Sequence, residues 1–238
     1  MKNIIFLAPP AAGKGTLSEL LVEKYNYGHI STGDLLRAEV KAGSELGKEA
    51  ESLMKAGKFV PDELIIKLIE NRVTQADCEN GYILDGFPRT KVQAEKYDEL
   101  LSKMGKDIGV VIYIDIEKDM AMKRACGRMT CPTCGKIYHK YSNEMSPKVE
   151  GICDICNVEL TQRADDSEET FIKRFDEYME KTMPLYDYYK EKGVLETISA
   201  HESKFDTLKE AVEILEKKEG LYDQYKIKKR NWINGNSW

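Results

Sequence analysis

The chain contains no apolar run long enough to span a membrane, no excess of basic residues and no low-complexity linker. A membrane-spanning helix needs about 20 apolar residues, and Met1-Lys2-Asn3 leads straight into a strand pattern rather than a signal peptide. The 36 basic residues are fewer than the 41 acidic ones, and the net charge of -5 argues against a general nucleic-acid or membrane-surface binder. We therefore expect a cytoplasmic protein with no nucleic-acid and no membrane partner.

The chain does contain a regular alternation of apolar runs and amphipathic stretches. At 238 residues, with 42% hydrophobic and 32% charged residues, it can bury a sizeable core. Strands that alternate with helices predict an α/β fold with a doubly wound parallel sheet. The expected strands cover residues 4–7, 28–31, 81–85, 109–115 and 194–198, and the expected helices cover 17–24, 32–40, 47–56, 63–73, 92–104, 117–127, 167–190 (with a kink or boundary at Pro184) and 207–218.

The loop after the first strand has the features of a phosphate-binding site. Pro, Ala and Gly form a compact turn, and Gly13-Lys14-Gly15-Thr16 open the helix that follows. Unpaired backbone N–H groups and the helix dipole favour an anion at such a junction. Lys14 adds a positive charge, and Thr16 adds a hydroxyl near the phosphates and Mg²⁺. The match to the phosphate-loop pattern is imperfect, because Ala8 stands at the first glycine and Gly15 separates Lys14 from Thr16.

The six cysteines favour a metal site over disulfides. Four of them form two C-x-x-C pairs, Cys131 with Cys134 and Cys153 with Cys156, and 18 residues separate the pairs. That spacing falls in the range of a four-thiolate zinc site, and thiols stay reduced in the cytoplasm. We predict that the four cysteines bind a structural metal ion, and a redox switch is the alternative. The surrounding residues 128–163 then form a small β insertion that is too short to hold a core unaided.

Arginines near the ends of the expected loops are the informative charges. A guanidinium binds phosphate oxygens bidentately, so a group of them around a phosphate loop suits a polyphosphate clamp. For any one arginine alone, a surface salt bridge is the alternative. The six arginines are Arg37, Arg89, Arg124, Arg128, Arg163 and Arg174.

Six stretches together carry a resemblance to one enzyme family over about residues 1–218. They are Pro10–Thr16, Ser31–Arg37, Gly57–Asp62, Asp85–Thr90 with Gln93, Gly127-Arg128 and Gln162–Asp166. In this order and spacing, the chain resembles the adenylate kinases of the zinc-containing, long-lid type. The resemblance implies a P-loop core at residues 1–30, 61–127 and 164–218, a helical AMP-binding insertion at 31–60, a small zinc-bound β lid at 128–163 and an additional tail at 219–238.

The resemblance also implies a role for each matching residue. Lys14, Asp85, Arg89, Arg128, Arg163 and Arg174 would be catalytic, with Asp85 orienting Mg²⁺ water and Asp165 and Asp166 acting as hinge and lid anchors. The ATP site would comprise Ala11, Ala12, Gly13, Lys14, Gly15, Thr16, Arg124, Arg128, Ile137, Tyr138 and Glu202. The AMP site would comprise Thr32, Arg37, Lys58, Phe59, Val60, Gly86, Phe87, Pro88, Arg89, Gln93, Arg163 and Arg174. Zinc would be bound by Cys131, Cys134, Cys153 and Cys156.

The implied reaction is phosphoryl transfer from ATP to AMP, giving two ADP, in a monomeric enzyme that uses Mg²⁺. Such a transfer needs the AMP oxygen in line with the γ-phosphorus and the developing charge neutralised, without a covalent intermediate. Lys14, Mg²⁺ and the arginines would stabilise the transition state while the two insertions close and exclude water.

Several positions depart from the family pattern. Ala8 and Ala11 replace two glycines of the phosphate loop, which costs roughly 1–2 kcal/mol if either position needs a positive φ. Met129 stands where a second arginine is common, the usual Gly-Thr is missing around Glu202, and the tail from Gly220 is additional. Two alternatives therefore stay open: a nucleoside monophosphate kinase with another acceptor, and a nucleotide-binding regulator without catalysis.

Overall fold

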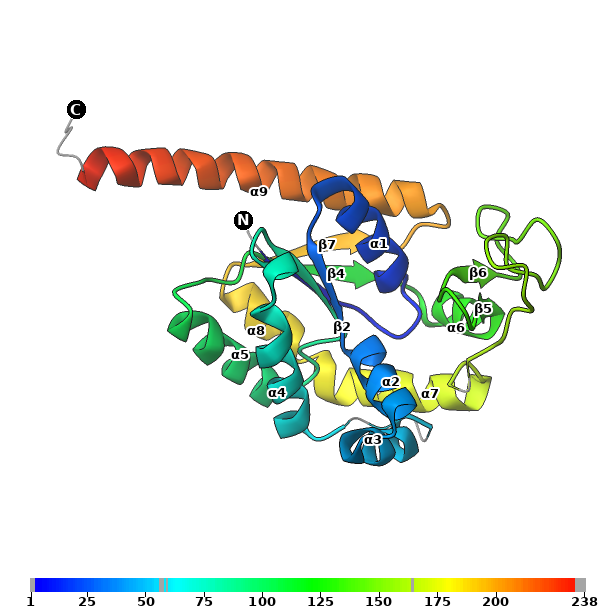
Figure 1. Cartoon of the computed structure of the whole chain (residues 1–238). Helices are drawn as coiled ribbons and strands as arrows, with labels where there is room; N and C mark the ends of the chain where they lie inside the picture. The colour runs from blue at the N-terminus through cyan, green and yellow to red at the C-terminus, as the bar shows by residue number, and fades with distance from the viewer. Residues whose placement is uncertain (1–2, 56–57, 59, 164, 234–238) are drawn as a thin grey trace.

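The computed structural model of the chain describes residues 3–55, 58, 60–163 and 165–233, with side chains described up to Lys218. Its centre is a sheet of five parallel strands in the order β2-β3-β1-β4-β7 (Figure 1). The strands are β1 (Asn3–Leu7), β2 (Gly28–Ser31), β3 (Tyr82–Asp85), β4 (Val110–Asp115) and β7 (Leu195–Ser199). The predicted parallel α/β sheet is confirmed.

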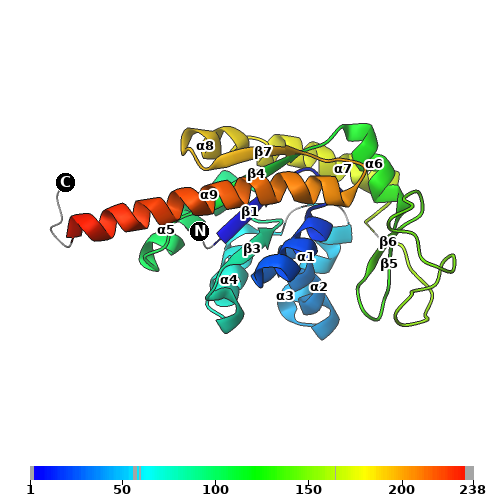
Figure 2. The ribbon, with the colours of Figure 1, turned by 90° about the horizontal axis from the view of Figure 1, so that it is seen from above.

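Helices cover both faces of this sheet because each central strand is apolar on both sides. Ile4 and Phe6 pack with Leu17 of α1 (Lys14–Tyr25) and Leu215 of α9 (Lys204–Ile233) on one face. Alternate strand residues, beginning with Ile5, pack on the other face against α4 (Asp62–Val73), α5 (Lys91–Lys103) and α8 (Leu185–Glu191). Figure 2 shows α9 lying across the sheet on the same side as α1. Because the five strands are parallel, their carboxyl ends all lie at the same edge of the sheet.

Two segments leave this core beside that edge. The first holds α2 (Thr32–Ala42) and α3 (Glu45–Lys55), where Ser44 Oγ accepts a hydrogen bond from Gly47 N at 2.9 Å and so caps α3. The second follows α6 (Lys118–Gly127) and contains the antiparallel pair β5 (Arg128–Thr130) and β6 (Ile137–His139). A short 3-10 turn, η1 (Ala76–Cys78), precedes β3. We call residues 128–163 the cysteine segment.

Two predicted helices differ from the observed ones. The expected helix 167–190 divides into α7 (Glu168–Glu177), a π-turn (η2, Tyr178–Thr182) and α8, with Pro184 at the boundary as expected. The prediction that the last helix ends at Lys218 is wrong, because α9 continues through Gly220 to Ile233. Figure 1 shows this continuation running past the body of the molecule. A single glycine only weakens a helix, so Gly220 alone does not end it. Residues 234–238 of the expected tail lie outside the described residues.

Among the described residues, no helix combines the length and apolar character that a lipid bilayer would require of a transmembrane segment.

Candidate active site

A deep cleft lies at the carboxyl-terminal edge of the parallel sheet, which is where open α/β sheets bind their ligands. Its volume is about 1670 Å³, larger than the roughly 300–1,000 Å³ of a pocket for one small ligand. The walls come from the loops after β1, β3 and β7, from α2 and from the cysteine segment. The cleft is therefore large enough to hold two nucleotide-sized molecules.

The loop after β1 forms the floor of the cleft. Gly13 has a φ of 100° and Ala11 a φ of 60°, both in the left-handed region. The Lys14 ammonium donates hydrogen bonds of 2.9 Å to the carbonyl oxygens of Ala8 and Pro9, so the loop is wrapped around its own lysine. Of the two alanines that replace family glycines, Ala11 needs the conformation that disfavours a Cβ, and Ala8 does not.

We expect Ala11→Gly to raise the free energy of unfolding by about 1 kcal/mol, because glycine adopts a positive φ without the steric cost that alanine carries. Chemical denaturation of the two proteins measures the difference. The matched control is Ala12→Gly, at a buried neighbour without a positive φ, which should lose stability. Equal or lower stability of Ala11→Gly would show that the loop is unstrained.

Lys14 lies in a strongly electropositive part of the cleft. Burial, opposed by Asp85 and reinforced by the charges of Arg89, Arg174 and Arg128, lowers the pKa of its ammonium to about 8. Positive charges held this close repel one another, and an anion bound among them relieves the repulsion. This part of the cleft is therefore built for a polyanion.

Three of the six arginines are paired with aspartates. Arg128 makes a two-point ion pair with Asp166, whose side chain is fully buried. Arg174 Nη1 lies 2.7 Å from Asp165 Oδ2, and Arg37 pairs with Asp34 one helical turn away. These carboxylates orient the guanidinium groups while part of each group still lines the cleft.

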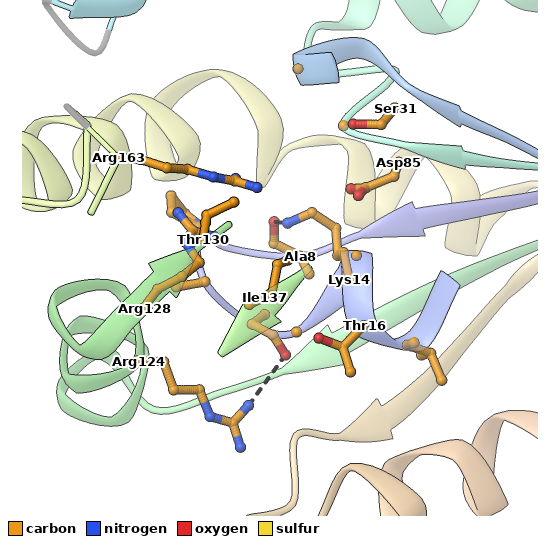
Figure 3. Close-up of a pocket in the computed structure, with 18 of the residues that line it drawn as sticks. Ala8, Lys14, Thr16, Ser31, Asp85, Arg124, Arg128, Thr130, Ile137 and Arg163 are labelled. Atoms are coloured by element: carbon orange, nitrogen blue, oxygen red, sulfur yellow. Dashed lines mark hydrogen bonds between the residues drawn. The ribbon is translucent and has the colours of Figure 1, made fainter. Parts of the chain in front are cut away.

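Arg163 differs from these three. Its guanidinium makes no hydrogen bond or ion pair to another residue that the structure describes, and Figure 3 shows the side chain reaching into the cleft. Burial lowers its pKa to about 10, and the positive charges of Arg128 and Arg37 contribute to the shift. Arg163 is thus a partly buried cation that faces other cations across the cleft.

Arg124 and Arg89 are held by backbone carbonyls. Arg124 donates to Ala12 O at 3.3 Å, the bond drawn in Figure 3, and to His201 O. It therefore joins the loop after β1 to the loop after β7. Arg89 donates through Nε to Gly86 O at 2.8 Å, and burial followed by Arg174 lowers its pKa to about 10.

The end of the cleft beside α2 carries polar groups that already have partners. Thr32 Oγ1 donates to Gly86 O at 2.8 Å. The Gln93 amide donates to Asp62 Oδ1 and accepts from Arg89 N, both at 2.7 Å. Asp62 also accepts a hydrogen bond from Thr90 Oγ1. Asp62 was not among the site residues expected from the sequence, and the available signal was its position at the start of a helix after Pro61.

The carboxylate of Asp85 and the hydroxyl of Thr16 line the cleft near Lys14 (Figure 3). A Cβ placed on Gly15 would lie 3.8 Å from Asp85 Oδ2, so the carboxylate lies beside the loop after β1. Oxygen donors of this kind are the ligands that Mg²⁺ prefers, and the residues fit such an ion bound together with a phosphate.

The structure brings most of the predicted site residues into this one cleft. The exceptions are side chains that point elsewhere. Tyr138 is buried in the cysteine segment, where its hydroxyl accepts from Asp154 N at 2.9 Å and lies 3.5 Å from Cys153 Sγ, so its side chain does not line the cleft. Its place over the nucleotide stays a prediction. Phe87 is buried against Tyr97 instead of lining the cleft. Phe59 lies outside the described residues.

The four paired cysteines converge on one point. The Sγ atoms of Cys131, Cys134, Cys153 and Cys156 all lie within 4.8 Å of one another. Cys134 Sγ and Cys153 Sγ are 3.8 Å apart, the separation of about 3.8 Å that two thiolates have on a tetrahedral zinc ion. Each pair is followed by a left-handed residue, Gly135 or Asn157. The cluster is compatible with a structural metal.

The three histidines lie outside this cluster. The ring of His139 contacts Arg124 O and Tyr141 N and is not part of the cysteine cluster. His29 lies 4.0 Å from Asp85, and His201 pairs with Glu210 at 2.7 Å.

Comparison with known proteins gives a consistent picture. The family model described as adenylate kinase matches residues 6–194. A protein named adenylate kinase from Clostridioides difficile (strain 630) is 48% identical over 201 residues, covering 84% of this chain and 92% of the relative. One from Thermodesulfovibrio yellowstonii is 49% identical over 197 residues, covering 83% and 91%. A third, from Listeria monocytogenes serotype 4a (strain HCC23), is 47% identical over 200 residues, covering 84% and 92%.

Proposed function

Because the chain belongs to the adenylate kinase family and is therefore a phosphotransferase acting on ATP, AMP and ADP, we propose that its cleft holds both nucleotides side by side, with their phosphates meeting above Lys14. The observation that supports this most is the convergence of Lys14 and the six arginines on one cleft. Cations gathered at such a density suit two phosphate chains better than one.

The donor ATP binds along the loop after β1. The backbone of residues 11–16 and the Lys14 ammonium hold its phosphates, with Arg124 and Arg128 on the opposite wall. Ile137 and the backbone of Tyr138 cover the nucleotide from the cysteine segment, and the loop at Glu202 lies beside the base. Asp85 would orient a water of the Mg²⁺ ion that binds with ATP, and this ion would supply positive charge against the phosphates.

The acceptor AMP binds at the end beside α2. Thr32, Arg37, Lys58 and Val60 form one wall, and Gly86, Pro88 and Arg89 with Gln93 form the other. The Gln93 amide suits adenine because it can donate and accept on one base edge. Since Asp62 and Arg89 N already bind both ends of that amide, AMP binding requires at least one of these bonds to be exchanged.

The chemistry follows from placement and charge. The AMP phosphate oxygen attacks the γ-phosphorus in line with the leaving oxygen of ADP, so no protein nucleophile is needed. Lys14, Arg89, Arg128, Arg163 and Arg174 stabilise the negative charge that spreads over the transferred group. Residues 31–60 and the cysteine segment close over the nucleotides and exclude water, which would otherwise hydrolyse ATP.

An acceptor screen tests this assignment. Purified protein with ATP and Mg²⁺ should form ADP rapidly with AMP and much more slowly with UMP or GMP. If UMP or GMP is phosphorylated while AMP is not, the acceptor site is assigned to the wrong nucleotide. If ATP binds and no acceptor reacts, the chain is the regulator that the sequence left open.

The domain arrangement belongs to the same proposal. Residues 1–30, 61–127 and 164–218 form the catalytic core, residues 31–60 the AMP-binding insertion, and the cysteine segment the lid. One chain supplies every group of the cleft, which supports a monomer. The cytoplasmic location stays a prediction.

We expect about one zinc ion per chain by elemental analysis, held by the four clustered thiolates. Replacing Cys131 with serine should release the metal and lower the melting temperature, because the metal closes a segment with little core of its own. Cys126→Ser is the matched control, since Cys126 lies in α6 outside the cluster. A metal-free preparation with unchanged melting temperature would contradict the zinc assignment.

A further inference from the structure

The loop between β6 and Pro147 is a compact structure that places one carboxylate at its tip. His139 N donates to Met145 O at 2.9 Å and Ser146 Oγ donates to Ser142 O at 2.7 Å, so the loop is closed by its own bonds. Its residues 142–145 line the cleft. Glu144 lies in the turn at residues 143–145 of this loop.

Glu144 crosses from the cysteine segment to the catalytic core. Its Oε2 accepts a hydrogen bond from the backbone N–H of Lys204, the first residue of α9, at 3.3 Å. Ser203 Oγ accepts from the next N–H, that of Phe205, at 3.2 Å. The two side chains thus satisfy successive unpaired donors of the helix, and the negative charge of Glu144 is favourable at that end of the helix dipole.

The core side of this contact is firmly attached to the phosphate loop. Arg124 bonds both His201 O and Ala12 O. His201 is held in turn by Glu210 of α9 at 2.7 Å. Residues 201–204 line the same cleft as residues 142–145. The Glu144 contact therefore closes a ring of bonds around the end of the cleft that the donor base occupies.

We propose that Glu144 is a positioning residue for the donor nucleotide: by binding Lys204 N it holds the loop of the cysteine segment against the start of α9 and fixes the outer wall of the donor-base end. The inference rests on the donor and acceptor ends assigned above. When this wall is held in place, ATP binds a preformed site, and the entropic cost of ordering the loop does not weaken its binding. The acceptor end, beside α2, lies outside this ring.

The test compares the KM values of the two substrates. Glu144→Ala should raise the KM for ATP about threefold, the effect of losing a charge at an exposed helix terminus, and leave the KM for AMP unchanged. Glu144→Gln keeps an oxygen acceptor without the charge, so its KM for ATP should lie between the two. The difference between wild type and Glu144→Ala should narrow at high salt, because the side chain is exposed.

Glu150→Ala is the matched control, since Glu150 is an exposed carboxylate of the same segment that does not line the cleft. Its KM values should equal those of the wild type. An unchanged KM for ATP in Glu144→Ala, or equal increases for ATP and AMP, would overturn the positioning role. ADP formation by the wild type in the same assay tests the proposed reaction separately, so failure of the one is distinguishable from failure of the other.

Discussion

Replacement of Lys14 by methionine is expected to lower kcat by about 10³-fold with the fold intact. Lys14 is the cation that the loop after β1 holds in place through two carbonyl oxygens, 2.9 Å from its ammonium. Methionine fills a similar volume but brings no charge to the transferred phosphoryl group. The melting temperature should change little, because burial already disfavours this charge and lowers the pKa of Lys14 to about 8.

A matched substitution separates the local charge from the overall charge. Lys24→Met removes one positive charge from the same helix at an exposed position, and its kcat should equal that of the wild type. Steady-state kinetics with saturating ATP and AMP, together with thermal unfolding of each variant, provides both readouts. A near-normal rate for Lys14→Met would remove Lys14 from the mechanism.

Replacement of Arg163 by methionine is expected to lower turnover by about 10³-fold, as loss of a transition-state arginine does in other phosphoryl-transfer enzymes. Unlike Arg128 and Arg174, Arg163 lacks a carboxylate partner among the described residues, and the neighbouring Arg128 and Arg37 contribute to lowering its pKa. Its charge is thus unfavourable until phosphate binds. The variant should unfold at the same temperature as the wild type or higher, so that activity falls without a loss of stability.

Two further variants define the role of Arg163. Arg163→Lys keeps the charge but loses the planar fork, so its rate should lie between those of the wild type and Arg163→Met. Lys148→Met removes an exposed charge of the same segment away from the cleft and should leave the rate unchanged. Wild-type turnover by Arg163→Met would mean that the unpaired guanidinium does not contact the phosphates.

Most of the core could be predicted from the sequence because its signals are local. Apolar runs such as residues 110–114 are buried on both faces, and the Gly-Lys junction after β1 opens a helix as expected. The C-x-x-C spacing likewise predicted a cluster that the structure brings together. In each case neighbouring residues alone decide the local structure.

The rest depended on contacts between distant segments. The sequence placed Tyr138 beside a nucleotide, but its side chain is buried next to Cys153, 15 residues further along the chain. No local sequence pattern predicts the Gln93–Asp62 bond or the Glu144–Lys204 bond. The two partners of these bonds are 31 and 60 residues apart in the sequence, so they meet only when the chain folds. The sequence left open whether Ala11 adopts a positive φ, and only the backbone conformation in the structure answers this question.

The central claim is that cations from three parts of the chain enclose two anionic nucleotides in one cleft. A crystal structure with an ATP–AMP bisubstrate analogue tests it most directly. The account predicts that Lys14 and the guanidinium groups of Arg128, Arg163 and Arg174 lie within hydrogen-bonding distance of the analogue's phosphate oxygens. Guanidinium groups that face bulk solvent in that complex would contradict it.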